Sequence, residues 1–201
     1  GYNLTSKEKR HSFTLKSNGL SRVLLTPILI LPTFKNSNNK QIQVNAIWDT
    51  GATSSVISPK VVEACNLISS GKDKVHTAGG TSVQNVYLVD IYLPNGILVK
   101  SVRVTEAKEI AGADALIGMD IISLGDFAIS NVDKKTVFSF RIPSKKVFDF
   151  VEDSKKYDEM VAKKEHREME LMLKKQENQP CPCGSGRKYK YCCAKKEKQQ
   201  S

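Results

Sequence analysis

Apolar and polar positions alternate in several short segments of the chain, which is the period-2 pattern of half-buried β-strands. In the segment 41–48 every second residue is apolar, and Ile47 makes both faces apolar just before the segment ends. Pro94-Asn95-Gly96, between two such segments, is typical of a tight hairpin turn. The strands predicted in this way are 12–16, 23–31, 41–48, 83–93, 97–104 and 136–142. The pattern therefore predicts a mostly β fold.

Two further segments carry helical signals. Ser58 as N-cap and Pro59 in the first turn predict a short helix over 59–65, in which we expect Cys65 to be a buried structural thiol. The charged stretch 144–178 has a broken apolar stripe in a sequence rich in Lys and Glu. We interpret this stretch as a helical linker docked on one side, with a partner or dimer face as the alternative.

The strand at 41–48 ends at Asp49-Thr50-Gly51. A carboxylate that follows two apolar faces is expensive to bury unless the structure uses or satisfies it. The alternative is a turn whose Asp caps local amides and whose Gly supplies a positive φ. Downstream lie the glycine-rich segment 76–81 and the apolar run 115–117, which ends at Gly118. This order of strand, acid turn, glycine hairpin and apolar-apolar-Gly favours a functional site at Asp49.

These motifs together resemble a retropepsin-like (clan AA) aspartic protease domain over about 23–143. Asp49-Thr50-Gly51-Ala52 is similar to the catalytic loop of that family, and Leu116-Ile117-Gly118 to the apolar-apolar-Gly that packs beside the loop. The segment 118–122 resembles the short helix that follows. Trp48 is bulkier than the residue expected before the acid, which bears on the shape of a subsite. The resemblance implies a closed β-barrel of the acid-protease type.

Peptide hydrolysis of this class uses two carboxylates and one water, and the carboxylates share a proton because neighbouring like charges cannot both ionise. No other Asp of the chain is followed by Thr-Gly or Ser-Gly, so one chain supplies half a site. The resemblance therefore implies a homodimeric aspartic endopeptidase in which Asp49 is catalytic, Thr50 hydrogen-bonds across the axis and the Gly51 amide holds the carboxylate. The flap residues that would close over a protein or peptide substrate are Ala78, Gly79 and Gly80.

A second hypothesis keeps the fold without the reaction. In this hypothesis the β-domain retains the protease shape with weak or no turnover, and the protein acts as an adaptor through its tail. The terminal strands 12–16 and 136–142 are candidates for a dimer contact, with plain core strands as the alternative.

Four of the five cysteines lie within 181–193 and can surround one tetrahedral Zn²⁺. Disulfides are the alternative, but a Cys-x-Cys and a vicinal pair are strained within themselves, and we see no secretory signal. The segment 179–201 resembles the SEC-C motif. That resemblance implies a structural zinc without an open position and docking of the tail on a protein or ribosomal partner. The ligands it implies are Cys181, Cys183, Cys192 and Cys193.

Composition adds few constraints. The 201 residues, 40% of them hydrophobic, suit one domain with an appendage. The domains we expect are an N-terminal extension (1–22), the protease domain (23–143), the linker (144–178) and the zinc motif (179–201). The three histidines do not accompany a Ser or Cys constellation, which argues against Ser/His or Cys/His catalysis.

Charge and hydropathy bear on the partners. The net charge is +10, and residues 141–201 hold 16 basic against 10 acidic residues. A basic metal module can meet phosphates or an acidic protein surface. We interpret these residues as a solvated basic tail and expect no nucleic-acid partner. The segment 23–31 is too short and too Pro-broken to span a membrane, and the thiolate cluster fits a reduced, cytoplasmic setting.

Overall fold

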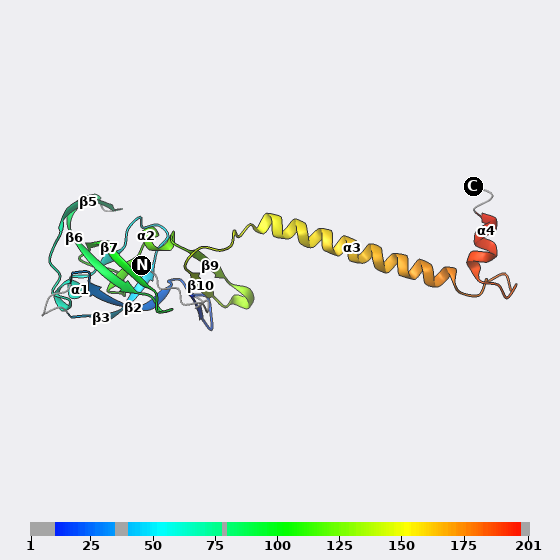
Figure 1. Ribbon diagram of the computed structural model, residues 1–201, viewed down its shortest axis with the longest axis horizontal. Coiled ribbons are helices and arrows are strands. Elements are labelled where there is room, and N and C mark those ends of the chain that lie inside the picture. The colour runs from blue at the N-terminus through cyan, green and yellow to red at the C-terminus, as the bar shows by residue number, and fades with distance from the viewer. Residues whose placement is uncertain (1–10, 35–39, 78–79, 198–201) are drawn as a thin grey trace. The chain divides into compact units, whose positions relative to one another are not determined.

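The computed structural model describes residues 11–34, 40–77 and 80–197. They fall into two compact units, a β-domain that ends at Lys146 and a tail unit that begins at Val147 (Figure 1). The elements of the β-domain are β1 (Ser12–Lys16), β2 (Leu25–Pro32), β3 (Ile42–Trp48), β4 (Val56–Ile57), α1 (Pro59–Ala64), β5 (Gly71–Thr77), β6 (Gly80–Tyr92), β7 (Leu98–Glu106), β8 (Ala115–Ile117), α2 (Met119–Ile122), β9 (Asp126–Ser130), η1 (Val132–Lys134) and β10 (Val137–Arg141).

Seven strands form one sheet in the order β2-β3-β8-β4-β7-β6-β5, and β2 also pairs with β6. The second pairing closes six strands into a barrel, from which β5 extends as an outer arm on β6. β3 and β8 run parallel, as do β4 and β7, whereas the other pairs in this sheet are antiparallel. The predicted mostly β fold with a closed barrel is confirmed.

The alternation in the sequence reappears as alternation of burial in the barrel strands. In β3, Val44, Ala46 and Trp48 are buried while Gln43 and Asn45 are exposed. The turn predicted after β6 is present, since the Gly96 N–H donates to the Leu93 carbonyl at 2.9 Å. Burial of the apolar side chains stabilises the barrel. Those at most 1% exposed include Ile30, Ile57, Val89, Ile91, Val104 and Ile117.

A second, three-stranded sheet has the order β1-β10-β9 and shares its apolar face with the barrel. The Trp48 ring lies 4.8 Å from the Phe140 ring and 5.3 Å from the Phe138 ring, centroid to centroid. The Trp48 indole N–H donates to the Thr26 hydroxyl at 2.9 Å. With 5% exposure, Trp48 fills this aromatic core. The expectation that its bulk bears on a subsite is wrong, because the ring packs inward between the two sheets.

Both predicted terminal strands are present, β1 with the predicted bounds and β10 one residue shorter at each end. β10 is the central strand, since β1 pairs with one of its edges and β9 with the other. Phe138 and Phe140 of β10 are buried. β10 is therefore a core strand, and among the described residues the outer strands of this sheet are β1 and β9. A dimer contact through β1 stays a prediction.

The helix predicted at 59–65 is observed as α1, but its cap differs from the prediction. Ser58 occupies the N-cap position without a capping hydrogen bond from its side chain. Its hydroxyl instead donates to Asp114 Oδ1 at 3.2 Å. Cys65 is buried as expected, with its sulfur 3.6 Å from the Ile30 carbonyl oxygen.

The tail unit contains the predicted helix in the charged stretch, α3 (Phe150–Glu177), followed by η2 (Tyr189–Tyr191) and α4 (Cys193–Glu197). Asp149 caps α3 by accepting from the amides of Val151 and Glu152 at 3.0 and 3.1 Å. None of the α3 residues is buried, and the docking of one side of this helix stays a prediction. In the part of the chain that the structure describes, every helix is too short or too polar to cross a membrane.

Candidate active site and metal centre

Asp49 follows β3 directly and begins the Asp49 loop, which we define as residues 49–55. The Asp49 N–H donates to the Ile117 carbonyl of β8 at 2.9 Å, so the loop leaves the barrel beside β8. The Gly51 N–H donates to Asp49 Oδ1 at 2.8 Å, as predicted. A Cβ on Gly51 would lie 3.1 Å from the same oxygen, so glycine leaves room for this turn. The half-buried carboxylate is thus held in one orientation by its own loop.

The segment after β8 packs against the underside of the Asp49 loop. The Met119 N–H donates to the Ala52 carbonyl at 2.8 Å. A Cβ added to Gly118 would lie 2.6 Å from the Ser54 carbonyl carbon and 3.0 Å from the Ala52 oxygen. The predicted apolar-apolar-Gly at 116–118 therefore meets the loop at a distance that only glycine permits.

The predicted flap coincides with the end of the β5–β6 hairpin. The last described pair of this hairpin is Thr77 opposite Gly80, which has a φ of 116°. Ala78 and Gly79 of the prediction lie outside the described residues. On β5, Asp73 accepts from the Arg103 guanidinium of β7 at 2.8 Å, which links the arm to the barrel across β6.

Thr50 is exposed at the apex of the Asp49 loop. The second carboxylate beside this loop, Asp120, is engaged by Ser55, whose amide donates to it at 3.0 Å and whose hydroxyl donates at 2.8 Å. Both carboxylate oxygens of Asp120 therefore accept hydrogen bonds from the last residue of the Asp49 loop. The sequence motifs did not identify this residue.

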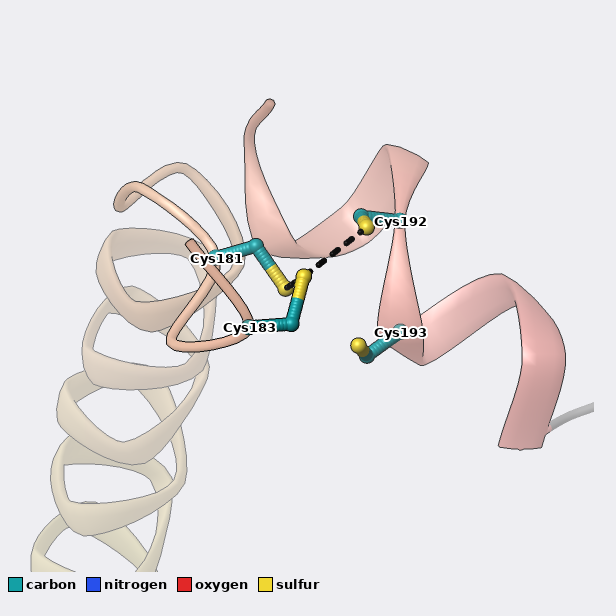
Figure 2. Close-up of side chains that lie close together, drawn as sticks. All are labelled: Cys181, Cys183, Cys192 and Cys193. Atoms are coloured by element: carbon teal, nitrogen blue, oxygen red, sulfur yellow. Dashed lines mark hydrogen bonds between the residues drawn. The ribbon is translucent and has the colours of Figure 1, made fainter. Parts of the chain in front are cut away.

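The four cysteines of the tail unit converge on one point, as Figure 2 shows. Their sulfur atoms all lie within 4.8 Å of one another, with 3.3 Å between those of Cys181 and Cys183 and 3.4 Å between those of Cys183 and Cys192. The first two cysteines belong to a turn in which Gly184 and Gly186 have φ values of 77° and 70°. The last two lie at the junction of η2 and α4.

The spacing of these sulfur atoms fits a tetrahedral metal ion. Four Zn–S bonds of about 2.3 Å place the sulfur atoms roughly 3.8 Å apart. The observed separations lie on both sides of that value, and the donors are all soft thiols. All four are free cysteines rather than members of disulfides. The donor set is consistent with metal binding.

The protonation of the cluster is uneven. Hydrogen bonds with Ser185 and then with Cys181 lower the pKa of the Cys183 thiol to about 6. Hydrogen bonds that involve Cys181 and Cys183 raise the pKa of Cys193 to about 12. Close contact between these sulfur atoms thus lowers the pKa of one thiol and raises the pKa of another.

Two family models match the chain. Residues 36–123 match the family described as "gag-polyprotein putative aspartyl protease". Residues 178–195 match the SEC-C motif. A comparison with curated proteins gives no match.

Several solved structures are similar to the chain. The EIAV protease complexed with the inhibitor HBY-793 is 21% identical, with a TM-score of 0.40, over 52% of this chain and 88% of that one. A retropepsin-like aspartic protease from Rickettsia conorii is 10% identical, with a TM-score of 0.44, over 69% and 99%. The retroviral protease-like domain of Ddi1 from Leishmania major is 18% identical, with a TM-score of 0.36, over 62% and 98%.

The family matches agree with the features of the two units. The first match includes β3, the Asp49 loop, the flap hairpin and β8 with α2. The second includes all four clustered cysteines. Residues 36–123 therefore match an aspartyl protease family model, and residues 178–195 of the same chain match the SEC-C motif.

Proposed function

We propose that the protein is a homodimeric aspartic endopeptidase that hydrolyses peptide bonds with a water activated by two Asp49 carboxylates. The observation that carries the proposal is the single carboxylate that follows a barrel strand and is fixed by the Gly51 amide. The chain has one such loop, so a second copy related by a two-fold axis supplies the other carboxylate.

In this dimer the two carboxylates share one proton. The ionised Asp49 takes a proton from the water as the water attacks the scissile carbonyl carbon, and the protonated Asp49 donates to the carbonyl oxygen. The amine then leaves with a proton from the pair. Because Oδ1 already accepts from Gly51, we assign the proton exchange to Oδ2. The exposed Thr50 hydrogen-bonds across the axis to the facing loop.

The flap and the shared proton complete the proposal. Ala78, Gly79 and Gly80 close over the bound peptide, where glycine allows close backbone approach and motion. Because the pair must keep one proton, activity favours acidic to mildly acidic pH. A rate that rises toward pH 9 contradicts this assignment.

For the tail we propose one structural Zn²⁺ per chain, held by Cys181, Cys183, Cys192 and Cys193. Four thiolates leave no open position, so the metal orders the turn and takes no part in hydrolysis. Exposed basic residues surround the cluster and suit recruitment of a protein or ribosomal partner, or of the substrate. They include Arg187, Lys188 and Lys195.

The test compares wild type, Asp49→Asn and the control Asp158→Asn, which changes an exposed carboxylate on α3. Each protein is incubated with peptides from a denatured proteome, and the new ends are sequenced. Wild type and the control cleave, whereas Asp49→Asn forms the dimer without cleaving. Undiminished cleavage by Asp49→Asn refutes the proposal.

A mixing experiment tests the half-site directly. When wild type and Asp49→Asn are mixed in equal amounts and exchange at random, half of the wild-type chains enter mixed dimers. Activity per wild-type chain then falls to about half, because a mixed dimer has one carboxylate. Activity that stays constant per wild-type chain shows that each chain works alone and contradicts the dimeric site.

A further inference from the structure

We infer that Asp120 is a positioning residue for the Asp49 carboxylate and acts through Ser55; this inference rests on the proposed function. Asp120 lies in α2, and each of its two carboxylate oxygens accepts a hydrogen bond from a different donor of Ser55. Oδ2 accepts from the Ser55 N–H at 3.0 Å, and Oδ1 accepts from the Ser55 hydroxyl at 2.8 Å. Ser55 is 1% exposed and Asp120 is half-buried, so water has limited access to these hydrogen bonds.

Ser55 is the last residue of the Asp49 loop. Hydrogen bonds, which we call ties, connect the segment 117–120 at three positions to this loop. Its first residue donates to the Ile117 carbonyl, and Ala52 in its middle accepts from the Met119 N–H. Its last residue is held by Asp120. The first two ties are made by backbone atoms, which any side chain supplies. The third depends on the side chains of Ser55 and Asp120.

The third tie, as observed, uses both oxygens of a carboxylate. The Ser55 hydroxyl oxygen accepts from the Gly118 N–H at 3.1 Å, which directs its own proton toward Asp120. Ser55 therefore presents two donors, and an ionised carboxylate accepts both. An Asn at position 120 would turn its NH₂ group toward one of these donors. Asp120→Asn thus keeps the shape of the side chain and breaks half of the tie.

Loss of these hydrogen bonds lets the far end of the Asp49 loop shift relative to Gly118. Misplacement of a catalytic group by about 1 Å costs roughly 100-fold in rate. We therefore expect Asp120→Asn and Ser55→Ala each to lower kcat by about 10- to 100-fold with KM nearly unchanged. The double variant is no slower than the slower single variant, because Asp120 acts through Ser55.

The matched control is Asp126→Asn. Asp126 is likewise a carboxylate that holds a turn through hydrogen bonds, and it is buried. It accepts from Arg141, Ser144 and the Lys145 amide, at the end of the β-domain rather than at the Asp49 loop. This variant is expected to lower stability while its folded fraction keeps the kcat of wild type. A purely structural role for Asp120 would give the same result as the control.

A second readout does not depend on activity. Amide hydrogen exchange is measured by NMR in wild type, Asp120→Asn and Asp126→Asn, after correction for global stability. In Asp120→Asn the Gly51 and Ser55 amides exchange at least about 10-fold faster, whereas in the control they keep wild-type rates. If wild type proves inactive, the proposed function fails while this readout still tests Asp120. Wild-type exchange at both amides, or a kcat loss that adds in full to that of Ser55→Ala, overturns the inference.

Discussion

Gly118 lies against the backbone of the Asp49 loop, and its replacement by alanine tests how closely the loop must fit. The new Cβ would lie 2.6 Å from the Ser54 carbonyl carbon and 2.7 Å from its oxygen. Ordinary carbon contacts need about 3.5 Å, so the loop must retreat by roughly 1 Å. The contacted atoms are backbone and cannot turn aside like a side chain. We expect a loss of about 1–3 kcal/mol in the free energy of unfolding, typical of overpacking.

The same displacement reaches Asp49, because the loop carries it. We expect kcat for peptide hydrolysis to fall by about 100-fold, the effect of a 1 Å misplacement. Stability is measured by urea denaturation and activity with a fluorogenic peptide that wild type cleaves. Gly19→Ala is the neutral control, since nothing lies within 4 Å of its added Cβ. Gly125→Ala is the steric control, since its Cβ would meet the Arg141 carbonyl away from the loop.

The three variants separate the two effects of the substitution. Gly125→Ala should lose stability and keep the kcat of its folded fraction, whereas Gly118→Ala should lose both. A Gly118→Ala protein with the stability and kcat of Gly19→Ala would refute the close contact between the loop and α2.

Three further predictions concern other parts of the chain. Hydrogen bonds from Ser144, the Lys145 amide and Arg141 hold the pKa of Asp126 below its ordinary value of 3.8. A carboxyl whose pKa is lower in the folded state than in the unfolded state stabilises the fold above the unfolded-state pKa. This stability is lost as the pH falls through the folded-state pKa. The urea midpoints of wild type and Asp126→Asn should therefore differ at pH 5 and converge in strong acid. Trp48→Phe removes the donor to buried Thr26 and should cost about 1–3 kcal/mol by urea denaturation; an unchanged midpoint contradicts the aromatic core. Metal analysis of the reduced protein should find about one zinc per chain, and chelation should release it without shifting the thermal midpoint of the β-domain; finding no zinc contradicts the metal site.

The barrel strands could be predicted because each has one buried face. The sequence of β3 alternates between apolar and polar residues because every second side chain is buried in the barrel. β5 escaped prediction for the opposite reason. Its sequence, Gly-Lys-Asp-Lys-Val-His-Thr, has no apolar face, and the strand forms because it pairs with β6 as an outer arm. β9 contributes Phe127 to the aromatic core, but its sequence, Asp-Phe-Ala-Ile-Ser, has three consecutive apolar residues in place of an alternation.

Side-chain partners were the second limit of the sequence. Ser58 has the residue type and position of a helix cap, but Asp114, 56 residues away, takes its hydroxyl. Trp48 was related to a subsite because it precedes the acid, whereas its ring turns toward β10. The partner of each of these side chains is set by tertiary contacts between distant segments, and a local sequence pattern does not contain those contacts.

The candidate site divides in the same way. Asp49-Thr50-Gly51 and the four cysteines are contiguous or closely spaced, so their chemistry is visible in the sequence. Asp120 is visible only through its contact with Ser55, 65 residues away. The available signal was an acid two residues after an apolar-apolar-Gly, together with a small hydroxyl residue six positions after Asp49.

Dimerisation costs less free energy if each half of the site is already ordered before the partner binds. Ordering a loop during association subtracts from the binding free energy, at about 0.5–1.5 kcal/mol for each side chain that is immobilised. In this chain the Asp49 loop is already fixed by Ile117, Met119 and Asp120, and the strand that delivers it is anchored by Trp48 in the aromatic core. In the dimer that we propose, the second copy would therefore meet a formed surface and would supply only the second carboxylate and the contacts that hold it. In that dimer the same hydrogen bonds would serve assembly and catalysis, and we expect variants that remove them to weaken both.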